Sequence, residues 1–191
     1  WHIINPDDPN ATALLEMIDG HIGNLAQALR TNNSERAAFE AAWMAHAITD
    51  GLTPAHHFPL EQAMVELRGG EGLETRTSIL KKNLMKGDNG IELIKNNWKF
   101  WGAKGMMTTH VAFEAGVASV VAYPRFKDAI PSSDEILQVK NHGYREYYLD
   151  QVHAVASMKM YDNFSKSGWT TDLAWQTNHE LMPIIIKSVM L

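Results

Sequence analysis

The chain of 191 residues contains no cysteine. This absence excludes disulfide bonds, thiolate metal sites and a cysteine nucleophile, and it leaves imidazole and carboxylate as the strong ligands for a metal. The sequence also lacks a long apolar run. The longest, near the C-terminus, is interrupted by Lys187 and is too short to span a bilayer, so we expect a soluble chain.

The chain has little excess charge of either sign. It carries 17 lysines and arginines against 22 aspartates and glutamates, a net charge of −5. This balance indicates no strong nucleic-acid footprint, and the 45% of apolar residues argues against disorder. No basic segment followed by an apolar stretch opens the sequence at Trp1, so we expect any signal peptide to have been removed or never to have been present. Length and composition predict one domain over residues 1–191.

Helical periodicity runs through the chain, whereas period-two alternation is sustained nowhere, although 117–122 is ambiguous. The expected helices cover about 11–30, 34–51, 59–67, 74–85, 91–101, 106–123, 132–140, 144–166 and 170–189. Asn10, Ser34 and Ser132 are the candidate N-caps. The pattern predicts an all-α, multi-helix bundle.

Nine histidines are a high number for this length, but only their spacing is informative. His46 and Asp50 lie four residues apart, so on a helix their side chains share one face and could share one metal ion. Pro54 ends that helix, and His56 then returns close to the pair as a third donor. The combined pattern is far less expected by chance than either half.

The same four-residue offset recurs at His110 and Glu114, among apolar neighbours. Alone, such a pair is more often a hydrogen-bonded pair on a helix surface. Beside the first motif, the metal interpretation is favoured, because an inward-facing imidazole and carboxylate need partners.

These motifs resemble those of the zinc-dependent phospholipase C and single-strand nuclease superfamily. That family carries His-x-x-x-Asp-x-x-x-Pro-x-His, then His-x-x-x-Glu, and before both a His-aromatic-aromatic-Asp-Pro-Asp segment. The counterparts here are 46–56, 110–114 and the opening His2-Ile3-Ile4-Asn5-Pro6-Asp7, in which isoleucines replace the aromatic pair and Asn5 replaces the first Asp. The resemblance implies a bundle of the phospholipase C type with about two Zn²⁺ sites. It assigns His2, His46 and Asp50 to one zinc, and His56, His110 and Glu114 to a second.

The chain departs from the family pattern in two ways. Family members place a Trp, a His and an essential Asp before the first of these segments, so a third zinc and a bridging carboxylate would need donors from an upstream segment or another chain. The stretch between the ligands is also longer than usual, which predicts a long insertion at about 58–108. Its large apolar residues fit either a core or a membrane-surface contact; they are Trp98, Phe100, Trp101, Met106 and Met107.

By this resemblance we expect a zinc-dependent phosphoric ester hydrolase that cleaves a phosphodiester, with phospholipid preferred over nucleic acid, using metal-activated water. Secretion or a periplasmic location is implied by the resemblance alone. The alternatives are a nuclease-like member and a non-catalytic, metal-stabilised helical domain, truncated or degenerate. The sequence identifies no catalytic base and no substrate-binding residue.

Overall fold

The computed structural model describes residues 3–124, 126–127 and 129–191, without the side chain of Leu73. All regular structure in these ranges is helical, which confirms the predicted all-α class. Whether the bundle is of the phospholipase C type stays a prediction. None of the helices in the described ranges combines the length and apolarity that crossing a bilayer requires.

The chain divides into two compact units. The first comprises Trp1–Phe58 and Val117–Leu191, and the second comprises Pro59–Gly116. The chain therefore leaves the first unit just after η1 (Pro54–His57) and returns to it within α6 (Met106–Val121). The insertion expected at about 58–108 falls in the second unit from residue 59 onward. Its standing as an insertion into a known family stays a prediction.

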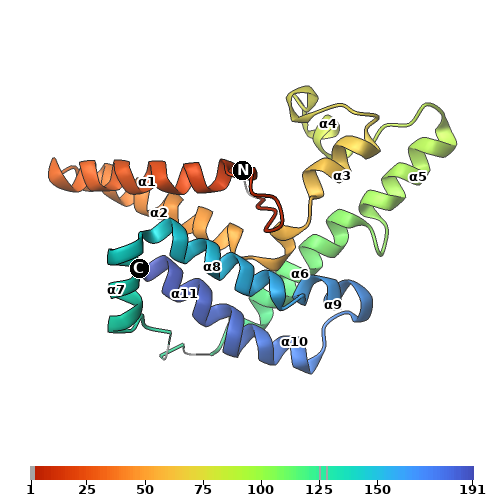
Figure 1. The fold of residues 1–191 in the computed structure, drawn as a ribbon. Helices are drawn as coiled ribbons and strands as arrows, with labels where there is room; N and C mark the ends of the chain where they lie inside the picture. The colour runs from red at the N-terminus through yellow and green to blue at the C-terminus, as the bar shows by residue number, and fades with distance from the viewer. Residues whose placement is uncertain (1–2, 125, 128) are drawn as a thin grey trace. The chain divides into compact units, whose positions relative to one another are not determined.

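The first unit is built around the antiparallel pair α1 (Ala13–Arg30) and α2 (Ser34–Gly51), which lie side by side (Figure 1). Helices α8 (Tyr144–Ser157) and α11 (Met182–Met190) pack against each other, and α11 also packs on α2. The remaining elements are α7 (Ser133–His142), α9 (Met160–Ser167), α10 (Thr171–Gln176) and the π-helical turn η3 (Thr177–Leu181). The core of this unit is formed by buried side chains, among them Leu14, Ile18, Ile48, Leu52, Tyr148, Val152 and Leu181.

Several helix ends differ from those expected. Thr12, not Asn10, precedes α1, and Asn33, not Ser34, caps α2 by accepting the Arg36 N–H. The helix predicted over 144–166 was wrong, because Lys159 adopts a left-handed conformation (φ 51°) that separates α8 from α9. The helix predicted over 170–189 contains the π turn of η3 between α10 and α11.

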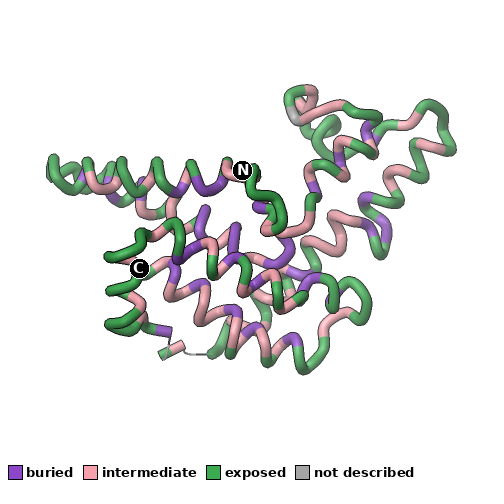
Figure 2. The backbone as a smooth tube through the Cα atoms, viewed as in Figure 1, coloured by how far each residue is buried: buried purple, intermediate pink, exposed green. Residues whose placement is uncertain are grey.

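The second unit comprises α3 (Leu60–Leu67), η2 (Leu73–Thr75), α4 (Ile79–Asn83), α5 (Gly90–Trp101) and the first part of α6. Its core is small. Met64, Met85 and Phe100 are buried together, and Leu67, Met106 and Met107 pack against them. Figure 2 shows much of this unit exposed around that core.

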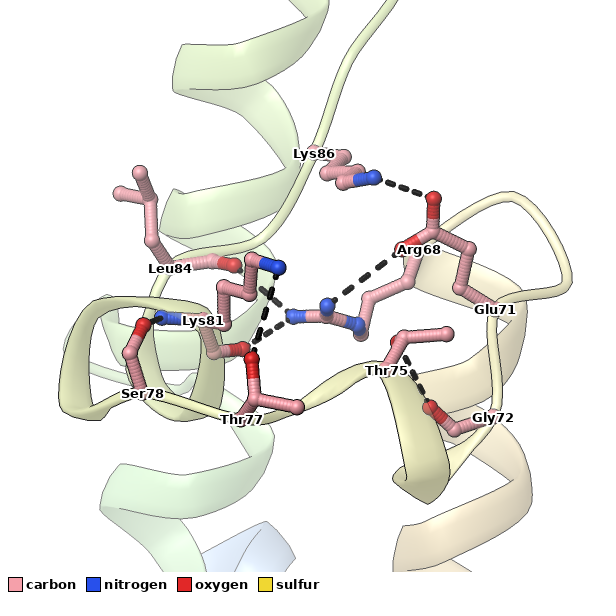
Figure 3. Close-up of polar contacts among 9 residues, drawn as sticks. All are labelled: Arg68, Glu71, Gly72, Thr75, Thr77, Ser78, Lys81, Leu84 and Lys86. Atoms are coloured by element: carbon pink, nitrogen blue, oxygen red, sulfur yellow. Dashed lines mark hydrogen bonds and ion pairs between the residues drawn. The ribbon is translucent and has the colours of Figure 1, made fainter.

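The helix predicted over 74–85 was wrong, because two polar side chains hold this segment open. The buried guanidinium of Arg68 donates Nη1–H bonds to the carbonyls of Lys81 and Leu84, the latter at 3.1 Å, and lies 3.6 Å from Glu71 (Figure 3). Asn97 then pairs with the extended backbone of Met85, accepting its N–H at 3.0 Å and donating to its carbonyl at 2.9 Å. The carbonyls of Lys81, Leu84 and Met85 therefore accept hydrogen bonds from side chains, whereas in a continuous helix they would accept backbone N–H groups.

Candidate metal centre

The C-terminal end of α2 presents the first pair of predicted ligands. His46 and Asp50 are one helical turn apart, and His46 Nε2 lies 3.4 Å from Asp50 Oδ2. The carboxylate is largely buried, with 13% of the side chain exposed, whereas the imidazole is 48% exposed. The two side chains therefore lie on one face of α2, as their spacing predicts.

The turn after α2 brings a second imidazole to the same carboxylate. Leu52 ends the helix, Pro54 starts η1, and His56 Nδ1 lies 3.9 Å from Asp50 Oδ1. The two oxygens of Asp50 thus face different imidazoles. The return of His56 towards Asp50 after the proline was predicted from the spacing, and the structure has it.

The N-terminal segment is attached to this turn. The backbone N–H of Ile4 donates to the carbonyl of His56 at 3.2 Å, and the Ile4 side chain is buried. His153 Nε2 donates in turn to the Pro6 carbonyl at 3.1 Å, which holds the segment against α8. His2, the remaining ligand predicted for the first zinc, lies outside the described residues. The attachment of its segment beside His56 was not foreseen from the sequence.

Close packing fixes the end of α2 that carries Asp50. The Tyr148 hydroxyl donates to the Ile48 carbonyl at 3.2 Å, and it is so close to Gly51 that a Cβ there would lie 2.1 Å from it. Leu14 closes the same space from α1, 2.5 Å from that position. Burial raises the pKa of Tyr148 well above its usual value, so the hydroxyl stays protonated and keeps donating. The close approach of Tyr148 and Leu14 therefore favours glycine at position 51.

The next histidine in the sequence, His57, bonds to a backbone carbonyl. His57 Nε2 bonds to the Gly51 carbonyl at 2.9 Å. Burial lowers the pKa of His57 below its usual value, although the Gly51 carbonyl opposes this. A neutral ring that donates to a backbone carbonyl stabilises the turn between α2 and η1.

The second four-residue pair lies on α6, in the second unit. His110 Nε2 is 3.1 Å from Glu114 Oε1. The imidazole is 11% exposed and the carboxylate 42% exposed. The adjacent Phe113 is fully buried, so this stretch of α6 is anchored in a core.

Three further histidines bond within the first unit. His21 bonds to the buried Glu40, His179 donates to the Trp175 carbonyl at 2.8 Å, and His153 bonds to Pro6 as above. Each of these imidazoles contacts a group other than the predicted ligands.

No protein-family model, no curated protein and no solved structure matches the chain.

Proposed function

We propose that the chain is a zinc-dependent phosphoric ester hydrolase that acts on a phosphodiester. The observation that carries the proposal is the position of Asp50, whose two carboxylate oxygens face His46 and His56 at 3.4 and 3.9 Å. Imidazole nitrogens and a largely buried carboxylate are donors suited to zinc.

The distances within the two four-residue pairs are compatible with metal ligation. Bonds from zinc to nitrogen or oxygen of about 2.0–2.2 Å place adjacent tetrahedral ligands roughly 3.3 Å apart. The His46–Asp50 separation of 3.4 Å is close to that value and exceeds the length of a charge-assisted hydrogen bond, about 2.7–2.9 Å. The His110–Glu114 separation of 3.1 Å is also compatible with two ligands of one ion.

We assign the first zinc to His2, His46 and Asp50. His46 and Asp50 are described, and His2 is assigned by the resemblance alone.

We assign the second zinc to His56, His110 and Glu114, which could together hold one ion. These residues lie close in sequence to the two points where the chain passes between its units, after Phe58 and after Gly116.

Bound zinc would supply Lewis acidity towards a phosphoryl oxygen and lower the pKa of a water molecule. The residues of the chain would hold the zinc in position for this chemistry. Asp50 would hold the first zinc, and the packing of Tyr148 against Gly51 would keep its helix end in place.

The proposal is tested by hydrolysis of bis(p-nitrophenyl) phosphate. We expect activity in the presence of zinc, loss with chelator, and recovery when zinc is returned. Asp50→Asn and His110→Ala should each reduce the rate by at least about 100-fold, because removal of a ligand should cost no less than removal of its supporting partner. His179→Ala, at an exposed imidazole on the π turn, is the matched control and should keep full activity.

Two results would contradict hydrolysis at this site. Turnover that survives Asp50→Asn would place the chemistry elsewhere. Stoichiometric zinc binding without turnover of phosphodiesters or phospholipids would instead favour a non-catalytic domain that the metal stabilises.

A further inference from the structure

One face of α5 is apolar and exposed. Four large side chains follow each other at helical spacing and lie on one side of the helix. They are Ile91, Ile94, Trp98 and Trp101, whose exposed fractions are 82, 72, 71 and 45%. Figure 2 marks much of α5 as exposed. A stripe of this size is unusual on a protein surface that only meets water.

The stripe is not a core face that failed to pack. The opposite side of α5 already carries Phe100, which is buried against Met64 and Met85. Asn97 on the inner side is also engaged, through its bonds to the backbone of Met85. The helix is therefore held on one side and presents its second apolar side outward.

The short helix α4 extends this apolar surface. The indole N–H of Trp101 donates to the carbonyl of Asn83 at 2.6 Å, which joins the end of α5 to the end of α4. Next to that bond, Leu84 is 51% exposed, and Ile79 and Leu80 on α4 are 80 and 75% exposed. We call the exposed side chains of Ile79, Leu80, Leu84, Ile91, Ile94, Trp98 and Trp101 the α4–α5 surface.

The charge around this surface is opposite in sign to that of the chain. Residues 79–104 contain six lysines and only two carboxylates, within a protein of net charge −5. The lysines are Lys81, Lys82, Lys86, Lys95, Lys99 and Lys104, and all are exposed. Lys86 pairs with Glu71 (Figure 3), whereas within the described ranges no ion pair engages Lys82, Lys95, Lys99 or Lys104. Lys99 and Lys104 line one cavity of about 1100 Å³ together with Trp98, so the positive charge lies beside the stripe.

We propose that the α4–α5 surface docks the protein on anionic phospholipid membranes. Tryptophan is suited to the boundary between headgroups and acyl chains, and flanking lysines are attracted to anionic lipid. Isoleucine and leucine suit acyl chains better than stacked bases, which favours lipid over single-stranded nucleic acid. A second copy of the chain docked through the same surface would bring like charges together. The inference does not rest on the proposed hydrolase activity.

The test uses the full chain and vesicles of phosphatidylcholine containing about 30% phosphatidylglycerol. We expect co-sedimentation and a blue shift of tryptophan fluorescence with these vesicles, and little of either with pure phosphatidylcholine. The double variants Ile94→Glu/Trp98→Ala and Lys95→Glu/Lys99→Glu should each weaken binding by about tenfold or more. The lysine variant changes only exposed charged side chains, so it keeps the test meaningful if the first variant folds poorly.

The controls separate this surface from general stickiness, general charge and the metal site. Leu29→Glu removes an apolar side chain that is 61% exposed on α1, and Lys140→Glu/Lys166→Glu changes the net charge equally in the first unit; both should bind as the wild type does. Asp50→Asn should also bind vesicles normally. Absence of binding to the anionic vesicles, equal binding by all variants, or displacement of the vesicles by single-stranded DNA would overturn the proposal.

Discussion

Glu40 is a buried carboxylate between α1 and α2. It lies on α2, N-terminal to the proposed ligands His46 and Asp50. It accepts a hydrogen bond from His21 and pairs with Arg36 one turn earlier. A buried carboxylate of this kind is stable only while its charge is compensated. The hydrogen bond from His21 lowers the pKa of Glu40 below its usual value, with Arg36 acting in the same direction and burial opposing both.

This pKa shift predicts how stability changes with acid. Because the pKa of Glu40 is lower in the folded state, its contribution is present above the unfolded value of about 4.3 and is lost as pH falls through the folded value. We expect Glu40→Gln to reduce the free energy of unfolding at neutral pH, and the difference from the wild type to shrink below about pH 4. Urea unfolding of both proteins, from neutral pH to below about pH 4, measures this difference in the free energy of unfolding.

Glu35→Gln is the matched control, because Glu35 is exposed on the first turn of the same helix. Its effect should be small at every pH. A difference between the wild type and Glu40→Gln that stayed constant down to pH 3, or grew on acidification, would contradict the assigned pKa shift.

Among the elements, α4 and the loop after it are held by a buried cation, Arg68, together with Asn97. Arg68 follows α3, and its buried guanidinium binds the carbonyls of Lys81 and Leu84 (Figure 3). Because the apolar core of the second unit is small, these bonds carry a large share of its order.

We predict that Arg68→Met destabilises the second unit by roughly 2–4 kcal/mol, since two bonds from a charged donor are lost and both carbonyls must find water. Thermal unfolding and amide hydrogen exchange at Met85 should report the loss. Lys82→Met, at an exposed position on α4, should change stability little. Equal protection of Met85 in Arg68→Met and the wild type would show that the loop does not depend on the guanidinium.

At the scale of the whole molecule, the features predicted best from the sequence are those set by residues close together in the chain, such as helix ends and pairs four residues apart. The end of α2 at Gly51 and the pairs His46–Asp50 and His110–Glu114 follow from turn chemistry and a period of 3.6 residues. The break at Lys159 carries no such signal, because neither glycine nor proline marks it. The opening of 74–85 depends on Arg68, which is remote in sequence, and periodicity could not tell which apolar face of α5 is buried.

The proposed function requires above all that the assigned residues of the chain bind metal. The described ones are His46, Asp50, His56, His110 and Glu114.

Elemental analysis of the purified chain tests that claim most directly, with a His46→Ala/His110→Ala variant measured in parallel. We predict about two zinc ions per chain in the wild type and marked loss in the double variant. His142→Ala/His179→Ala, which removes two exposed imidazoles, should retain the wild-type content. Absence of bound metal in the wild type, or equal zinc in all three proteins, would contradict the account.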